Sequence, residues 1–178
     1  TRPLTALGGG ETCPRWSPDG HEIAFLHSPE GYGQKDLYVV GVDGGEPLCL
    51  TSALDRTIDN PRWLGSGLEV LFEARMGVER QLYAVPRVGG DLRRLTTASA
   101  VHGGTTVSAS GDTFATLTSA SDVPQALTVG GVADGTRRVA VISNAHISDT
   151  RFGDTRVVRW AGADGLGIEG LLVLPPDY

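Results

Sequence analysis

The sequence predicts an all-β protein, a partial β-propeller of about three four-stranded antiparallel blades that do not close into a ring. A segment that ends a strand at a Trp recurs at Trp16 and Trp63, which are 47 residues apart. A third copy has Val107 in place of the Trp, 44 residues after Trp63. A second segment repeats independently as Leu37-Tyr38 and Leu82-Tyr83, with a spacing of 45. No segment keeps apolar residues at helical spacing for three turns, which excludes a helical solenoid.

Each repeat predicts four short strands. The first strand ends at the Trp or its counterpart, and a hairpin turn leads to an apolar second strand. Asp19-Gly20 favours such a turn because both residues tolerate the positive φ that it requires. The third strand carries the Leu-Tyr pair, and a Gly-Gly turn leads to a fourth strand that ends in Leu-Thr. Four strands within about 45 residues, repeated along the chain, are typical of propeller blades.

The repeats divide the chain into five expected segments. Residues 1–5 resemble the end of a blade and predict the outer strand of a preceding blade. We expect three blades at 6–52, 53–98 and 99–145, followed by a linker and the first strands of another domain at 146–178. A propeller closes with about four to eight blades, so we expect the sequence to be part of a longer protein.

Composition limits the classes of partner. The net charge of −6 argues against nucleic-acid binding, which favours a basic face. No apolar run approaches the length of about 20 residues that spans a membrane, so we expect no membrane partner. The N-terminus shows no basic-then-apolar leader, which predicts a cytoplasmic location. Cys13 and Cys49 fall in the first and fourth strands of one blade, too far apart for a disulfide, and we expect free thiols.

The first repeat resembles the propeller repeat that TolB-like proteins share with the prolyl oligopeptidase family of serine peptidases. It contains Pro14-Arg15-Trp16-Ser17-Pro18-Asp19-Gly20, followed by Ile23-Ala24-Phe25. The C-terminal part is similar to the start of that family's α/β-hydrolase domain. The residues that carry this second resemblance are Val157-Val158-Arg159-Trp160, Asp164-Gly165, Ile168-Glu169-Gly170, Leu171-Leu172-Val173, Pro175-Pro176 and Tyr178. Within the family, the chain is similar to the acylaminoacyl-peptidase branch.

The resemblance implies the non-catalytic propeller portion of a serine peptidase that cleaves peptides or acylated peptides. Such a portion limits access to an active site in a following hydrolase domain and helps to position the substrate. The implied partners are that domain and the peptide, an oligomer is compatible with the sequence, and we expect no cofactor. The family's nucleophile lies in a Gly-x-Ser-x-Gly turn that this sequence lacks, so we expect the catalytic residues beyond Tyr178. The alternative is a TolB-like protein-binding scaffold without enzymatic activity.

Four arginines are candidates for contact with substrate or with the following domain. Arg15 and Arg62 occupy the same place in adjacent innermost strands, and Arg75 and Arg80 flank the variable loop of the middle blade. The resemblance implies that the axial face of the propeller covers the active site, where such side chains contact substrate. Ion pairing within the propeller is the alternative, and we favour it.

The other conspicuous residues are interpreted as structural. Trp16 and Trp63 are expected in the core between blades rather than on a ligand, because they hold equal positions in neighbouring repeats. The turn residues are Asp19, Gly20, Gly67 and Gly111. No histidines show the spacing of a metal site, so we expect no metal, and we place His102 and His146 in surface connections.

Overall fold

The computed structural model describes residues 2–121, 124–147 and 150–178. Thr1 of the expected outer strand, residues 122–123 of the expected third blade and residues 148–149 of the expected linker lie outside the described residues. Within the described ranges, no helix has the length and apolar character needed to cross a membrane.

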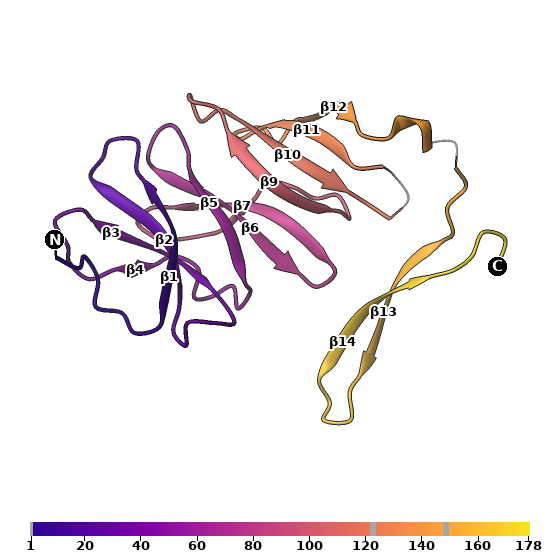
Figure 1. The fold of residues 1–178 in the computed structure, drawn as a ribbon, viewed down its shortest axis with the longest axis horizontal. Helices are drawn as coiled ribbons and strands as arrows, with labels where there is room; N and C mark the ends of the chain where they lie inside the picture. The colour runs from indigo at the N-terminus through magenta and orange to yellow at the C-terminus, as the bar shows by residue number, and fades with distance from the viewer. Residues whose placement is uncertain (1, 122–123, 148–149) are drawn as a thin grey trace.

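The first two blades are four-stranded and antiparallel, with the strands in chain order (Figure 1). Blade 1 comprises β1 (Gly10–Trp16), β2 (Glu22–Ser28), β3 (Asp36–Gly41) and β4 (Leu48–Cys49). Blade 2 comprises β5 (Ile58–Trp63), β6 (Glu69–Met76), β7 (Glu79–Pro86) and β8 (Arg93–Arg94). Cys13 and Cys49 thus lie on opposite edges of blade 1, and both are free thiols, as predicted.

The third blade forms although its repeat lacks the Trp. It comprises β9 (Val101–Val107), β10 (Thr113–Ser119), β11 (Ala126–Gly131) and β12 (Arg137–Ile142). A single parallel pairing of Arg80 with Val101 joins its first strand to β7 of blade 2. After a short 3₁₀ helix, η1 (Ala145–Ile147), the chain forms a separate hairpin of β13 (Thr155–Ala161) and β14 (Gly167–Val173). The arc of blades does not close, which confirms the predicted fold class (Figure 1).

The turn between the first two strands has the same geometry in all three blades. A glycine with positive φ occupies it each time, at 74° for Gly20, 69° for Gly67 and 78° for Gly111. The N–H of each glycine donates to a carbonyl three residues earlier. In blade 1, Asp19 adds side-chain support, because its Oδ1 accepts from Ser17 Oγ at 2.6 Å.

The innermost strands of all three blades contain a β-bulge at the same position, although a different residue type occupies it in each blade. Cys13 in β1, Asn60 in β5 and Gly104 in β9 all have positive φ, at 55°, 53° and 63°. The strand register shifts around each of them. Their spacings of 47 and 44 residues equal those of the Trp positions, so each innermost strand carries a β-bulge at the same place.

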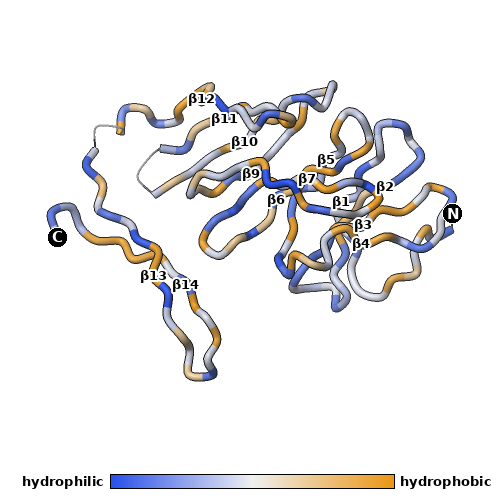
Figure 2. The backbone as a smooth tube through the Cα atoms, turned by 180° about the vertical axis from the view of Figure 1, so that it is seen from behind, coloured by the Kyte–Doolittle hydropathy of each residue, from blue (hydrophilic) through white to orange (hydrophobic). Residues whose placement is uncertain are grey.

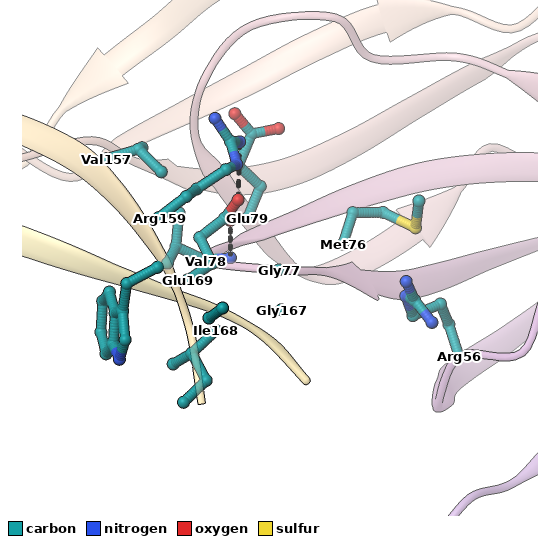
Figure 3. Close-up of a pocket in the computed structure, with 12 residues that line it drawn as sticks. Arg56, Met76, Gly77, Val78, Glu79, Val157, Arg159, Gly167, Ile168 and Glu169 are labelled. Carbon is teal, nitrogen blue, oxygen red and sulfur yellow. Dashed lines mark hydrogen bonds and ion pairs between the residues drawn. The ribbon is translucent and has the colours of Figure 1, made fainter. Parts of the chain in front are cut away.

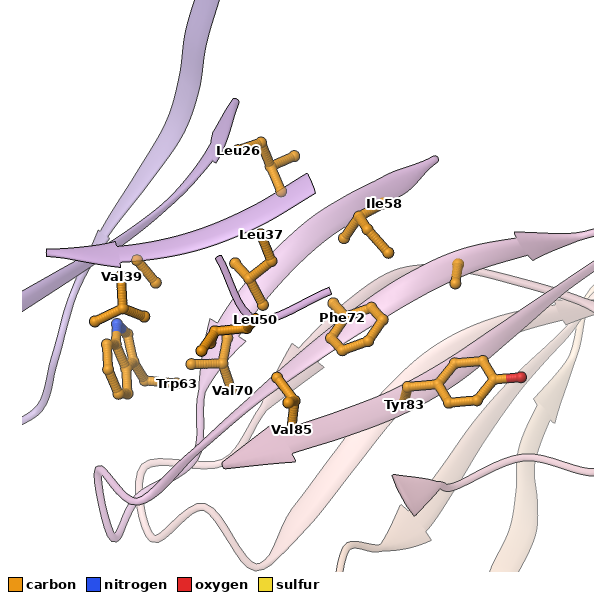
Figure 4. Packing of buried hydrophobic residues seen from close by; sticks show 12 residues of the cluster. Leu26, Leu37, Val39, Leu50, Ile58, Trp63, Val70, Phe72, Tyr83 and Val85 are labelled. Atoms are coloured by element: carbon orange, nitrogen blue, oxygen red, sulfur yellow. The ribbon is translucent and has the colours of Figure 1, made fainter. Parts of the chain in front are cut away.

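The main core lies between blades 1 and 2 (Figure 4). The Trp63 ring is 8% exposed within it, and the indole Nε1 donates to the Arg15 carbonyl of blade 1 at 2.9 Å. The buried members of the cluster are Ala24, Leu26, Leu37, Val39, Leu50, Ile58, Trp63, Val70, Phe72, Ala74, Tyr83 and Val85. A smaller cluster, which includes Leu71 and Phe114, joins blade 2 to blade 3.

The interpretation of Trp16 as a core residue was wrong. Its side chain is 64% exposed, although it holds the position in β1 that Trp63 holds in β5. Trp63 is buried by the blade that precedes its own. No blade precedes β1 in the structure, so Trp16 lacks the corresponding neighbour.

The segment before β1 also differs from expectation. Residues 2–5 form no strand, whereas the sequence predicted an outer strand at 1–5. A strand forms where a neighbouring strand completes its hydrogen bonds, and residues 2–9 have no such neighbour. Pro3, Leu4 and Thr5 instead line a hollow with Phe25 and Val40 of blade 1.

Candidate functional site at the junction of blade 2 and the hairpin

The β13–β14 hairpin contacts blade 2 at the tight turn between β6 and β7 (Figure 3). The Val78 backbone N–H in this turn donates to Glu169 Oε1 of β14 at 3.1 Å. The other carboxylate oxygen forms an ion pair with Arg159 Nη2 at 2.6 Å. The Val78 hydrogen bond, followed by the Arg159 interaction, lowers the pKa of Glu169. Glu169 therefore stays ionised in this contact and links the hairpin to the propeller.

Gly77 makes this close approach possible. Its φ is +63°, in the left-handed region that favours glycine. A Cβ atom on Gly77 would overlap the Glu169 carboxylate. The turn thus needs glycine both for its backbone conformation and for the space that Glu169 occupies.

A cavity of about 920 Å³ lies between the turn and the hairpin. From the propeller it is lined by Arg56, Met76, Gly77, Val78 and Glu79, and from the hairpin by Val157, Arg159, Trp160, Ala161, Gly167, Ile168 and Glu169. The lining combines apolar side chains with cations and carboxylates. Such a mixture suits a peptide, which presents both apolar side chains and polar groups.

The hairpin exposes apolar side chains away from this cavity as well. Figure 2 shows hydrophobic segments along both of its strands. Leu171 is 53% exposed, and Leu172 and Val173 are exposed too. A two-stranded hairpin is at best marginally stable alone in water, so contact with blade 2 contributes to its placement.

Arg75 and Arg80 lie at the junction end of blade 2 but do not line the cavity. They are paired across β6 and β7, beside the turn that contacts the hairpin. Arg75 forms an exposed ion pair with Asp59, and Arg80 forms one with the buried Glu73, both at 3.7 Å. Both side chains therefore have partners within the propeller.

Arg15 and Arg62 lie at the other end of the blades. Arg62 pairs in register with Leu71, which lies six residues before the Gly77 turn. At about 3.3 Å per residue, this distance along β6 is about 20 Å. The hairpin does not reach either arginine, and neither forms an ion pair with the side chains that the structure describes.

A buried polar group joins blades 2 and 3 close to the junction. Glu73 is 2% exposed, and its Oε1 accepts from Asn60 Nδ2 at 2.8 Å and from the Thr105 N–H at 3.0 Å. The Asn60 amide also donates to the Thr105 carbonyl at 2.9 Å. With Arg80 beside it, the Glu73 carboxylate has partners for both oxygens, which a buried charge requires.

His102 needs a correction, because it lies in β9 rather than in a surface connection. It is 1% exposed, and its Nδ1 lies 3.2 Å from Thr118 Oγ1. Burial, followed by the Arg137 charge, lowers the pKa of His102 to about 4. Across the described ranges, no three His, Cys, Asp or Glu side chains form a group that could hold a metal ion.

The sequence interpretation missed Glu73 and Glu169, which make the central contacts. Each carboxylate interrupts an apolar strand, as in Val70-Leu71-Phe72-Glu73-Ala74 and Ile168-Glu169-Gly170-Leu171. An acidic residue inside an apolar run is the available signal, since a buried carboxylate needs a specific partner. The identity of those partners depends on the tertiary structure.

Comparison with known proteins supports the family resemblance. No family model matches the chain. The chain is 25% identical over 174 residues to Dipeptidyl-peptidase 5 of Porphyromonas gingivalis, covering 96% of this chain and 25% of that protein. It is 36% identical over 66 residues to the uncharacterized peptidase YuxL of Bacillus subtilis, covering 37% of this chain and 10% of that protein. These matches support a propeller segment of the prolyl oligopeptidase family.

Solved structures share the fold. Dipeptidyl peptidase 4 of Porphyromonas gingivalis has a TM-score of 0.71 at 16% identity, over 93% of this chain and 24% of that chain. The acylaminoacyl peptidase of Pyrococcus horikoshii has a TM-score of 0.67 at 19% identity, over 86% and 23%. TolB of Acinetobacter baumannii has a TM-score of 0.60 at 19% identity, over 90% and 40%. The prolyl oligopeptidase-type and TolB-type propellers thus share this blade architecture.

Proposed function

We propose that the chain is the non-catalytic propeller portion of a serine peptidase that cleaves peptides or acylated peptides. The observation that carries the proposal is the match to Dipeptidyl-peptidase 5 along 96% of the chain, which covers both the blades and the hairpin. The docked hairpin supports it, because its exposed apolar side chains fit the first strands of a further sheet.

In this proposal, the nucleophilic serine and its partners lie in a following α/β-hydrolase domain. The hairpin connects that domain to blade 2, and the Glu169–Val78 hydrogen bond fixes the connection. The blade ends next to the hairpin then limit access to the active site and help to place the peptide. The cavity lined by Arg56, Arg159 and Trp160 lies on this route.

A covalent probe tests the proposal. The 178-residue chain is compared with a longer protein that includes the residues encoded after Tyr178, and both are incubated with a serine-directed fluorophosphonate. We expect stoichiometric labelling of the longer protein only, at a serine outside the present sequence, because an activated nucleophile is needed for labelling. Labelling of the 178-residue chain would contradict its non-catalytic role.

The same experiment addresses the alternative. A TolB-like binding scaffold shares the fold, as the match to Acinetobacter baumannii TolB indicates. If the longer protein is neither labelled nor active on dipeptide and acyl-peptide nitroanilides, the peptidase proposal is wrong and the scaffold is favoured. Access control is tested by substrate size: short peptides should be hydrolysed, and a folded protein should not.

A further inference from the structure

Two arginines hold equivalent positions in neighbouring innermost strands, at the blade ends opposite to the hairpin. Arg15 of β1 pairs with Ala24, and Arg62 of β5 pairs with Leu71, so both occupy the same place in their blades. Their strands are neighbours, because Trp63 Nε1 donates to the Arg15 carbonyl at 2.9 Å. The fold therefore brings two guanidinium groups together at the inner edge of the arc.

These two groups differ from most arginines of the chain. Nine of the 14 arginines form an ion pair with a carboxylate, but Arg15 and Arg62 form none with the described side chains. Among the described residues, each guanidinium donates to one acceptor, the carbonyl of the preceding proline, at 3.0 Å for Pro14 and 2.9 Å for Pro61. Since a guanidinium has five N–H donors, most donors of both groups remain free for a ligand.

The positive charge at this place is only partly balanced. Burial lowers the pKa of Arg62 and the nearby Arg15 charge lowers it further, whereas the Glu73 carboxylate, which Arg80 already pairs, raises it. The whole chain has a net charge of −6, so this local positive charge is opposite in sign to that of the chain as a whole. Two neighbouring, partly buried cations disfavour each other, and a bound anion would remove that repulsion.

We propose that Arg15 and Arg62 form a binding site for an oxyanion, either the carboxylate of a peptide or a phosphate group. Guanidinium groups bind carboxylate and phosphate oxygens through parallel N–H···O bonds, which gives both charge and geometric complementarity. The site lies about 20 Å along β6 from the hairpin contact, so it is separate from the junction cavity. It does not depend on the proposed peptidase function.

Cys13 provides a reporter beside the site. It is an exposed free thiol two residues before Arg15, and its charge influences the pKa of Arg62. Iodoacetate and iodoacetamide both alkylate the thiolate, but only iodoacetate is negatively charged. The ratio of their rates at Cys13 therefore measures the local positive charge and is independent of the thiolate fraction. Cys49, on the outer strand of the same blade, is the internal reference.

The rates are measured on the 178-residue chain at low ionic strength by peptide-resolved mass spectrometry. For a unit charge about 6 Å away in water, we expect the ratio to fall about threefold in Arg15→Gln and in Arg62→Gln. Arg62→Lys keeps the charge and should keep most of the ratio. The matched control Arg75→Gln removes an arginine four residues along β6 from Leu71, about 13 Å away, and should change the ratio by less than about twofold. Equal ratios in the wild-type, Arg15→Gln and Arg62→Gln proteins, with matching melting curves, would overturn the site.

Added anions then identify the ligand class. Sodium phosphate and sodium succinate are titrated against sodium chloride at constant ionic strength, and the alkylation of Cys13 by iodoacetamide is followed. Saturable protection by succinate alone assigns the site to carboxylates, and protection by phosphate alone assigns it to phosphates. Protection by both supports a general oxyanion site, and in every case Arg62→Gln should abolish it. No saturable protection by either salt would overturn the proposal.

Discussion

Replacement of Trp63 with alanine removes the largest side chain from the core between blades 1 and 2. The ring is 8% exposed and packs among apolar side chains of both blades. Loss of this burial and the resulting cavity cost about 3–5 kcal/mol of unfolding free energy. The indole also donates to the Arg15 carbonyl at 2.9 Å, and loss of that bond costs about 1 kcal/mol more. Since a domain typically has about 5–15 kcal/mol of stability, we expect a severe loss of soluble, folded protein.

Trp16 supplies a matched control for this substitution. It is the same residue type at the equivalent position of the preceding blade, but its side chain is 64% exposed. Trp16→Ala therefore removes an indole from an innermost strand without opening a cavity. We expect it to cost about 1 kcal/mol or less, as surface substitutions generally do.

Urea denaturation followed by far-ultraviolet circular dichroism measures both variants. The Trp63→Ala midpoint should fall well below that of the wild-type protein, or the variant should fail to accumulate in soluble form. The Trp16→Ala midpoint should stay close to the wild-type value. Equal midpoints for the two variants would refute the assignment of Trp63 to the core between blades.

Acidification should destabilise blade 3 through His102. Its pKa of about 4 in the folded state lies below 6.5, so the unfolded chain gains a proton in this range while the folded state does not. The unfolding free energy should therefore fall by about 2 kcal/mol, after solvent screening, as the pH drops from 6.5 to 4. If the unfolding free energy of His102→Gln falls with pH as steeply as that of the wild-type protein, this reasoning is wrong. Gly77→Ala should displace the hairpin from blade 2, which is measured as faster hydrogen exchange of the Val78 amide. Gly89→Ala has similar backbone strain at a φ of +82° but open space around it, and should leave that amide protected.

The repeat made the blade architecture predictable because its most regular residues act locally. Gly20, Gly67 and Gly111 sit in turns that need positive φ, so the requirement is visible in each repeat by itself. Burial of a Trp is different, because it depends on the adjacent blade. Trp16 and Trp63 therefore look equivalent in sequence while one ring is exposed and the other is buried.

The contacts of the candidate site were not predictable for a related reason. Val78 and Glu169 are 91 residues apart, and Asn60 and Thr105 are 45 apart. No local pattern specifies which backbone group a carboxylate or an amide will bind at such separations. Arg15 and Arg62 lie in innermost strands, and Arg75 and Arg80 lie in β6 and β7 on either side of the turn between them. The ion pairs that distinguish Arg75 and Arg80 from the other two depend on the packed structure.

The β-bulges at Cys13, Asn60 and Gly104 bear on how such a protein can change length during evolution. A bulge increases the local twist of its strand, so each innermost strand carries its own share of the curvature of the arc. Each unit of about 45 residues therefore carries its own bulge, independently of closure of the whole assembly. Duplication or deletion of one such unit in the gene would add or remove a complete blade together with its bulge.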